Sequence, residues 1–127
     1  MSKTTRERHV LVAEDDPAIR RLIEVSVRDF ATVHTVEDGA KALAWLKENP
    51  NVDLLISDVM MPGMDGFTLS KMLRRDAKLS RIPVIFLTAK GGARDIVNGI
   101  NAGARHYLTK PFDRDDLVAK VRSTLRV

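Results

Sequence analysis

Acidic, hydroxyl and ammonium side chains follow short apolar runs at four places in this chain. The runs lead into Glu14-Asp15-Asp16, Ser57-Asp58, Thr88 and Lys110. Carboxylates held close together repel one another, so they need a cation or raised pKa values. Oxygen ligands without histidine or cysteine beside them favour Mg²⁺, whose open coordination positions suit a phosphoryl oxygen. The pattern therefore predicts a Mg²⁺ site that handles a phosphoryl group.

The same residues suggest separate roles in phosphoryl chemistry. Asp58 is the candidate nucleophile, because a carboxylate can form an acyl phosphate. Glu14 and Asp15 are placed to hold the cation, while Lys110 and Thr88 offer a positive charge and a donor to the phosphoryl group. Each residue alone has an ordinary explanation as a helix cap or solvated loop residue, and Asp16, directly before Pro17, fits the helix cap. The prediction rests on their coincidence at four strand ends.

Five strand-like runs alternate with five helical patterns along the chain. The expected strands are 10–13, 32–36, 54–56, 84–87 and about 106–109. The expected helices carry their apolar residues at helical spacing. These are Ile19, Leu22, Ile23 and Phe30; Ala42, Leu43 and Leu46; Leu69, Met72 and Leu73; Ile96, Val97 and Ile100, ending near Gly103; and Leu117, Val118, Val121 and Leu125.

This alternation predicts an α/β fold, a doubly wound five-stranded parallel sheet with helices on both faces. The first, third and fourth runs are apolar throughout and should be interior, whereas the second and fifth carry polar residues and belong at the edges. Right-handed crossovers then favour the flavodoxin-like order 2-1-3-4-5. Ligands bind such sheets beyond the carboxyl ends of the strands, where the order reverses. That point lies between the first and third strands, beside Asp15 and Asp58.

Length and composition fit one globular domain. The chain has 127 residues, of which 44% are hydrophobic and 30% charged, and it has no cysteine, which excludes disulfides and thiolate chemistry. No apolar run reaches the roughly 20 residues that cross a bilayer. We expect a polar N-terminal extension over residues 1–8, a domain over 9–127 and a cytoplasmic location.

The net charge of +4 raises the question of nucleic-acid binding. Basic residues are densest in Lys71–Arg81, but no aromatic residues interleave them, so we expect a charged surface and not a nucleic-acid site. His9, His34 and His106 lie away from the acidic strand ends. None of them is expected to be a ligand of this Mg²⁺ site.

The ordered motifs resemble the receiver domains of two-component response regulators, including the single-domain chemotaxis type. The matching pieces are VLVAEDD, SDVMMPGMDG, FLTAK and GARHYLTKPF. The resemblance implies that a sensor histidine kinase or phosphotransfer protein phosphorylates Asp58. It implies direct Mg²⁺ ligation by Asp15, Asp58 and the Met60 carbonyl, with Glu14 acting through water. It also implies that Thr88 and Lys110 contact the phosphoryl group, that Tyr107 is a switch residue, and that the Lys110-Pro111 bond is cis.

One departure from the family pattern affects the expected partners. Arg105-His106 stands where many transcription-factor receivers carry an acidic pair used in dimer salt bridges, so we expect a monomer or weak dimer. The basic residues Lys90, Arg94, Arg105, Arg114 and Lys120 suggest a downstream protein with an acidic surface.

The leading hypothesis is a phosphorelay receiver that catalyses its own phosphorylation and dephosphorylation, without turnover of a separate substrate. One alternative is a pseudo-receiver that signals without phosphate. Another is a hydrolase of the haloacid dehalogenase type, which the absence of a DxD motif after the first strand disfavours.

Overall fold

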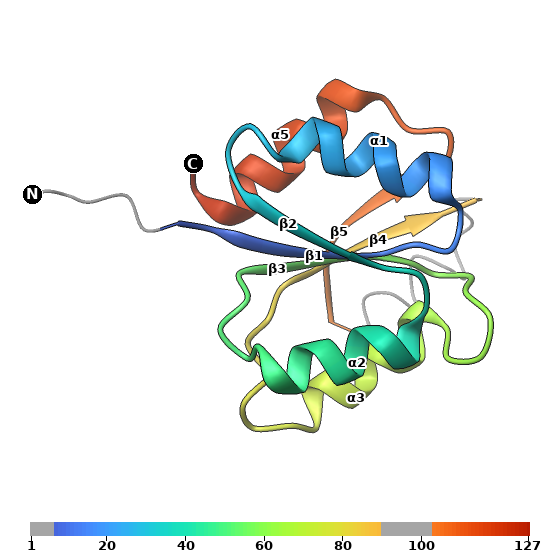
Figure 1. Cartoon of the computed structure of the whole chain (residues 1–127), viewed down its shortest axis with the longest axis vertical. Helices are drawn as coiled ribbons and strands as arrows, with labels where there is room; N and C mark the ends of the chain where they lie inside the picture. Colours follow the sequence, from blue (N-terminus) through green and yellow to red (C-terminus); the bar gives the residue numbers. More distant parts are fainter. Residues whose placement is uncertain (1–6, 90–102) are drawn as a thin grey trace, which may run out of the picture.

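Five parallel strands form one sheet in the order β2-β1-β3-β4-β5, as predicted (Figure 1). The computed structural model describes residues 7–89 and 103–127. The strands are β1 (His9–Ala13), β2 (Thr32–Val36), β3 (Leu54–Asp58), β4 (Val84–Thr88) and β5 (Ala104–Thr109). Every residue of β3 and β4 is buried, whereas β2 and β5 are mostly half-buried. The apolar runs therefore identified the interior strands correctly.

Four described helices cover the two faces of the sheet. In Figure 1, α1 (Pro17–Val27) and α5 (Arg114–Leu125) lie on one face, and α2 (Gly39–Glu48) and α3 (Gly66–Arg74) on the other. Each begins after an aspartate whose side chain accepts hydrogen bonds from first-turn amides; these caps are Asp16, Asp38, Asp65 and Asp113. The helix predicted around Ile96, Val97 and Ile100 lies outside the described residues.

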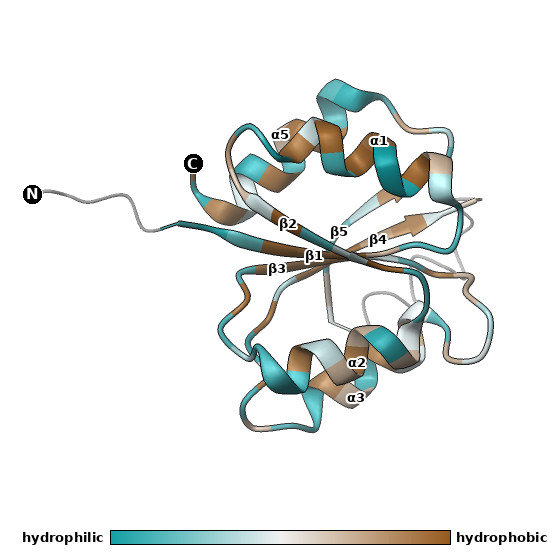
Figure 2. Ribbon diagram, in the orientation of Figure 1, coloured by the Kyte–Doolittle hydropathy of each residue, from teal (hydrophilic) through white to brown (hydrophobic). Residues whose placement is uncertain are grey.

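Apolar residues from strands and helices form a core on each face, and Figure 2 shows the hydrophobic colour concentrated on the inner strands and the helix sides facing them. Leu11, Leu55 and Phe86 pack beneath α2 and α3, while Val12, Ile56 and Leu87 pack beneath α1 and α5. The alternation follows from strand geometry, because successive side chains point to opposite faces. The two cores fix the sheet between the helix layers, and so they fix the positions of the residues at the strand ends.

Details of two elements differ from the sequence prediction. Helix α1 ends at Val27, so Phe30 lies beyond it, and Leu22 is 40% exposed. The buried side of α1 uses Ile23 and Val27, with Ser26 between them; the Ser26 hydroxyl donates to the Leu22 carbonyl, which satisfies a polar group that hydropathy alone would place outside. Strand β5 begins two residues earlier than expected, so His106 is its third residue and not its first.

Arg74 has a structural role within the basic stretch Lys71–Arg81. Its guanidinium donates to the carbonyls of Ser80, Ile82 and Gly103, so it ties the segment after α3 to the start of β5. This removes one charge from the surface that the sequence presents as a basic cluster. Among the described helices, none combines the length and apolar character needed to span a membrane.

Candidate functional site

Three carboxylates meet at the carboxyl ends of β1 and β3. One oxygen from each of Glu14, Asp15 and Asp58 lies within 4.8 Å of the others. Asp58 is the last residue of β3, and Glu14 follows β1 directly, held by a hydrogen bond from its amide to the Val36 carbonyl at 3.1 Å. The sheet register that pairs Ala13 with Ser57 thus brings together residues more than 40 positions apart. The three carboxylates that the sequence placed at these strand ends therefore lie together.

The Lys110 ammonium lies between two of these carboxylates. Its Nζ is 2.8 Å from Glu14 Oε1 and donates to Asp58 Oδ2 at 3.0 Å. The Lys110 amide donates to the Thr88 carbonyl at 2.6 Å, which holds the chain beside the end of β4, and the Lys110-Pro111 bond is cis. Burial alone lowers the pKa of Lys110, but hydrogen bonds and charge from Glu14 and Asp58 outweigh it and raise this pKa above its ordinary value.

Glu14 is the most buried acid of the site. Its side chain is fully inaccessible, and its Oε2 accepts from the Asp16 amide at 3.0 Å. Burial raises the pKa of Glu14 to about 7, with the Asp58 charge adding to the rise, although hydrogen bonds from Lys110 and the Asp16 amide oppose it. A carboxylate so poorly solvated gains from a nearby cation, which replaces the water it has lost.

The contribution of Glu14 to the free energy of unfolding of the metal-free protein should therefore fall as pH rises from about 4.5 to about 7. Folded Glu14 retains its proton up to the higher value, whereas the unfolded chain releases it near the lower one. Unfolding then releases a proton within this window, so higher pH favours the unfolded state, by on the order of 3 kcal/mol in all. Urea unfolding in EDTA at several pH values measures the slope. Glu14→Gln should flatten it, and an unchanged slope in that variant would contradict the assignment.

The remaining predicted site residues occupy the same end of the sheet. Thr88 ends β4 and is 3% exposed, whereas Met60 is 70% exposed and its amide donates to Asp58 Oδ1 at 3.2 Å. Tyr107 lies further back on β5, half-buried, with its ring centroid 5.8 Å from that of Phe86. Asp16 is the helix cap that the sequence indicated and stands outside the carboxylate group.

Two further residues support the site, although the sequence pattern predicts no role for either. Arg20 Nη1 donates to the Glu14 carbonyl at 2.8 Å and so helps to fix the end of β1. Gly66 approaches the backbone at the phosphoacceptor candidate: a Cβ there would lie 2.3 Å from the Asp58 carbonyl oxygen. The Asp65-Gly66 pair in the sequence indicates a turn. The three-dimensional packing shows why a glycine is needed at this position, because a side chain would clash with the backbone of Asp58.

The donor set fits Mg²⁺. Glu14, Asp15 and Asp58 supply hard oxygen atoms, the only ligand type in the group, and Asp15 is exposed and open to solvent on one side. The adjoining Lys110 charge and Thr88 hydroxyl suit an anion bound next to a cation. The arrangement can therefore hold a divalent metal and an anionic oxygen group side by side.

The predicted basic partner surface is only partly described. Lys90 and Arg94 lie outside the described residues. Arg105 and Arg114 are exposed, but the Lys120 ammonium is paired with Asp116 at 2.6 Å. Because Asp116 offsets the charge of Lys120, the described part of the expected partner surface is less positive than its number of basic residues indicates.

Known proteins match most of this chain. The family described as response regulator receiver domain matches residues 10–122. The DNA-binding dual master transcriptional regulator RpaA of Synechocystis is 42% identical over 118 residues, covering 92% of this chain and 48% of RpaA. Response regulator PleD of Caulobacter vibrioides is 42% identical over 92% of this chain and 26% of PleD. The chain thus spans half or less of the length of these relatives.

Solved structures of response regulator receivers have the same fold as this chain. Vibrio cholerae chemotaxis protein CheY4 superposes with a TM-score of 0.88 at 30% identity, over 94% of this chain and 100% of CheY4. The Francisella response regulator 1452 receiver domain has a TM-score of 0.84 at 34% identity, over 94% of this chain and 98% of that one.

Proposed function

This chain belongs to the response regulator receiver domain family, and from that premise we propose that Asp58 accepts a phosphoryl group in a Mg²⁺-dependent reaction. The observation that carries the proposal is the Lys110 ammonium, within 3.0 Å of both Glu14 and Asp58 in a three-carboxylate group. We assign the receiver to residues 9–127 and place its work in the cytoplasm. The phosphoryl donor is a histidine kinase or phosphotransfer protein, and the output is an altered surface for a downstream protein.

The proposed reaction divides among the residues of the site. An Asp58 carboxylate oxygen attacks phosphorus as the bond to the donor's histidine nitrogen breaks, giving an acyl phosphate and a free imidazole. Lys110 releases its contact with Asp58 Oδ2 and pairs with a phosphoryl oxygen, while the Thr88 hydroxyl donates to another. Asp15, Asp58 and the Met60 carbonyl would hold Mg²⁺ directly and Glu14 would act through water. Bound Mg²⁺ offsets the repulsion between the carboxylates and the incoming phosphoryl oxygens.

Intact-mass measurement after incubation with acetyl phosphate tests this proposal. Wild type with Mg²⁺ should gain one phosphoryl mass, because the small donor needs only the receiver's own residues. Asp58→Asn with Mg²⁺, and wild type with EDTA, should gain none: the first lacks the nucleophile and the second leaves the anions unshielded. Asp65→Asn is a matched control, since Asp65 is a half-buried helix cap that lies outside the carboxylate group. A phosphoryl gain in Asp58→Asn would reject the site assignment, and no gain in wild type would favour the phosphate-independent alternative.

Thr88 and Tyr107 are the proposed route from the site to the surface. If the Thr88 hydroxyl moves toward a phosphoryl group on Asp58, space opens behind β4, and the half-buried Tyr107 ring beside Phe86 can turn inward to fill it. The Tyr107 ring resonances should therefore shift when Mg²⁺ and beryllofluoride are added, and the shift should shrink markedly in Thr88→Ala. NMR of both proteins measures this. An unshifted Tyr107 in wild type would refute the switch, and an equal shift in Thr88→Ala would remove Thr88 from it.

A further inference from the structure

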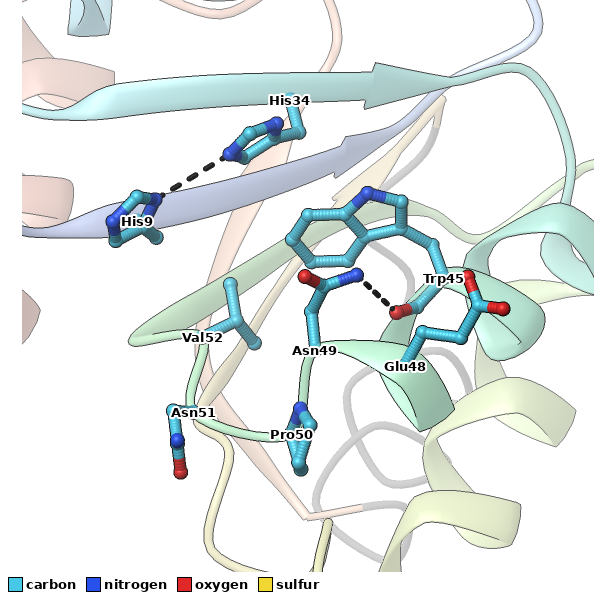
Figure 3. Close-up of a pocket in the computed structure, with 8 residues that line it drawn as sticks. All are labelled: His9, His34, Trp45, Glu48, Asn49, Pro50, Asn51 and Val52. Carbon is cyan, nitrogen blue, oxygen red and sulfur yellow. Dashed lines mark hydrogen bonds between the residues drawn. The ribbon is translucent and has the colours of Figure 1, made fainter.

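A hollow of about 340 Å³ lies near the amino ends of β1 and β2, at the opposite end of the sheet from Asp58. It is bounded by His9 and His34 from the two strands, by Trp45 from α2, and by the segment that follows this helix, as Figure 3 shows. The phosphoacceptor chemistry uses none of these side chains.

The two histidines face one another across adjacent strands. The register pairs Leu11 with His34, which places His34 diagonal to His9 on the same face of the sheet. His9 Nδ1 lies 3.4 Å from His34 Nε2, and the ring planes differ by only 15° (Figure 3). Two imidazole nitrogens at this separation either share one proton or can both bind one ion.

The separation of these nitrogens suits a tetrahedral metal. Two nitrogens bound at about 2.05 Å to a tetrahedral ion lie about 3.3 Å apart, close to the observed 3.4 Å. We propose that His9 Nδ1 and His34 Nε2 form a two-imidazole site for a tetrahedral transition-metal ion such as Zn²⁺, with Cu²⁺, which also binds imidazole strongly, as its paramagnetic probe. Water in the adjoining hollow completes the coordination. Imidazole nitrogens favour these ions over Mg²⁺, so this site and the carboxylate site select different metals.

Glu7 supplies the outer contact that histidine ligands usually have. Its Oε1 lies 3.5 Å from His9 Nε2, the ring nitrogen that points away from His34, and its other oxygen accepts a hydrogen bond from the Thr32 hydroxyl. A carboxylate in this position favours a proton on Nε2 and leaves the Nδ1 lone pair free for a metal. His34 must then carry its proton on Nδ1. The neutral ring needs only a change of tautomer, and no net proton is released.

Trp45 gives the proposed site its own reporter. Its ring centroid is 4.7 Å from that of His34, and it is the only tryptophan of the chain. A paramagnetic ion such as Cu²⁺ bound to His34 should quench the indole fluorescence. The signal is local, because the carboxylate site lies at the other end of the sheet.

A Cu²⁺ titration of the full chain at neutral pH, followed by Trp45 fluorescence, tests the proposal. Excess Mg²⁺ keeps the carboxylates occupied. We expect saturable quenching at one equivalent, with affinity reduced at least about tenfold in His9→Gln and in His34→Gln. His106→Gln is the matched control, because His106 is a half-buried strand histidine on β5. It should bind as wild type does. Thermal unfolding in EDTA verifies that each variant is folded.

Electron paramagnetic resonance of Cu²⁺ bound to the wild type is an independent measurement that needs no variant. Hyperfine structure from two imidazole nitrogens is expected. A spectrum without them, wild-type affinity in either His9→Gln or His34→Gln, or an equal loss in His106→Gln would overturn the proposal. None of these outcomes bears on phosphorylation of Asp58, which the mass measurement tests separately.

Discussion

Replacing Lys110 by methionine should slow phosphorylation of Asp58 by acetyl phosphate by about 10²- to 10³-fold. This is the range found when one preorganised donor to a developing charge is removed. Lys110 is the described cation within 3.0 Å of both Glu14 and Asp58, and its side chain is only 18% exposed, so water replaces the ammonium poorly. Methionine retains the length and apolar stem and removes the charge alone. The time course of intact mass under Mg²⁺ gives the rate.

The same substitution should raise the pKa of Glu14 and lower the free energy of unfolding in the metal-free protein. Without Lys110, buried Glu14 faces Asp58 with no ammonium between them, and the pKa of Glu14 should rise above about 7. At low pH Glu14 can take up a proton, so the variant should lose little unfolding free energy relative to wild type. At high pH Glu14 is charged, and the loss should approach the roughly 3–5 kcal/mol of a broken buried pair. Added Mg²⁺ should recover part of this loss.

Lys120→Met is the matched control for Lys110→Met. Lys120 is also paired with an aspartate, but on the surface of α5 and one helical turn away, where such pairs contribute little. In Lys120→Met, Asp58 should be phosphorylated by acetyl phosphate at the wild-type rate. Equal rates for Lys110→Met and Lys120→Met would show that the ammonium between the carboxylates has no part in the chemistry.

Gly66→Ala should destabilise the protein by about 3 kcal/mol and misplace the phosphoacceptor. The new Cβ would lie 2.3 Å from the Asp58 carbonyl oxygen and 3.0 Å from Ser57 Oγ. The closest atom is backbone, so no side-chain rotation relieves the clash, and α3 must move away from the end of β3. The hydrogen bond from the Gly66 amide to the Val59 carbonyl, 2.9 Å long, closes the intervening loop and would be strained as well.

Gly63→Ala is the matched control for Gly66→Ala. It measures the loss of unfolding free energy caused by replacing a loop glycine where no clash occurs. Gly63 has a φ of +77°, and a Cβ there would meet nothing within 4 Å. Its replacement should cost only the backbone strain of about 1 kcal/mol. Urea unfolding compares the two variants, and the phosphorylation rate should fall in Gly66→Ala but stay near wild type in Gly63→Ala. Equal destabilisation of both would contradict the packing argument.

Local sequence signals determined the fold and the composition of the site. The strand order follows from which runs are wholly apolar and from right-handed crossovers, and the start of α1 follows from Asp16 before Pro17, because capping and alternation act over a few residues. The convergence of Glu14, Asp15 and Asp58 was predictable for the same reason. Parallel strands bring their carboxyl ends to one edge.

Only the tertiary structure decided burial and long-range partners. Glu14 and Asp15 are neighbours in the chain, but one is fully buried and the other exposed, since that depends on the turn leaving β1 and the helices packed around it. The exposure of Leu22 and the use of Arg74 as a structural tie likewise depend on surrounding elements. His9 and His34 meet because β1 and β2 pair in one register, and a shift by one residue would turn His34 to the other face. Such contacts depend on the register and packing of distant segments, which the local pattern of residues does not contain.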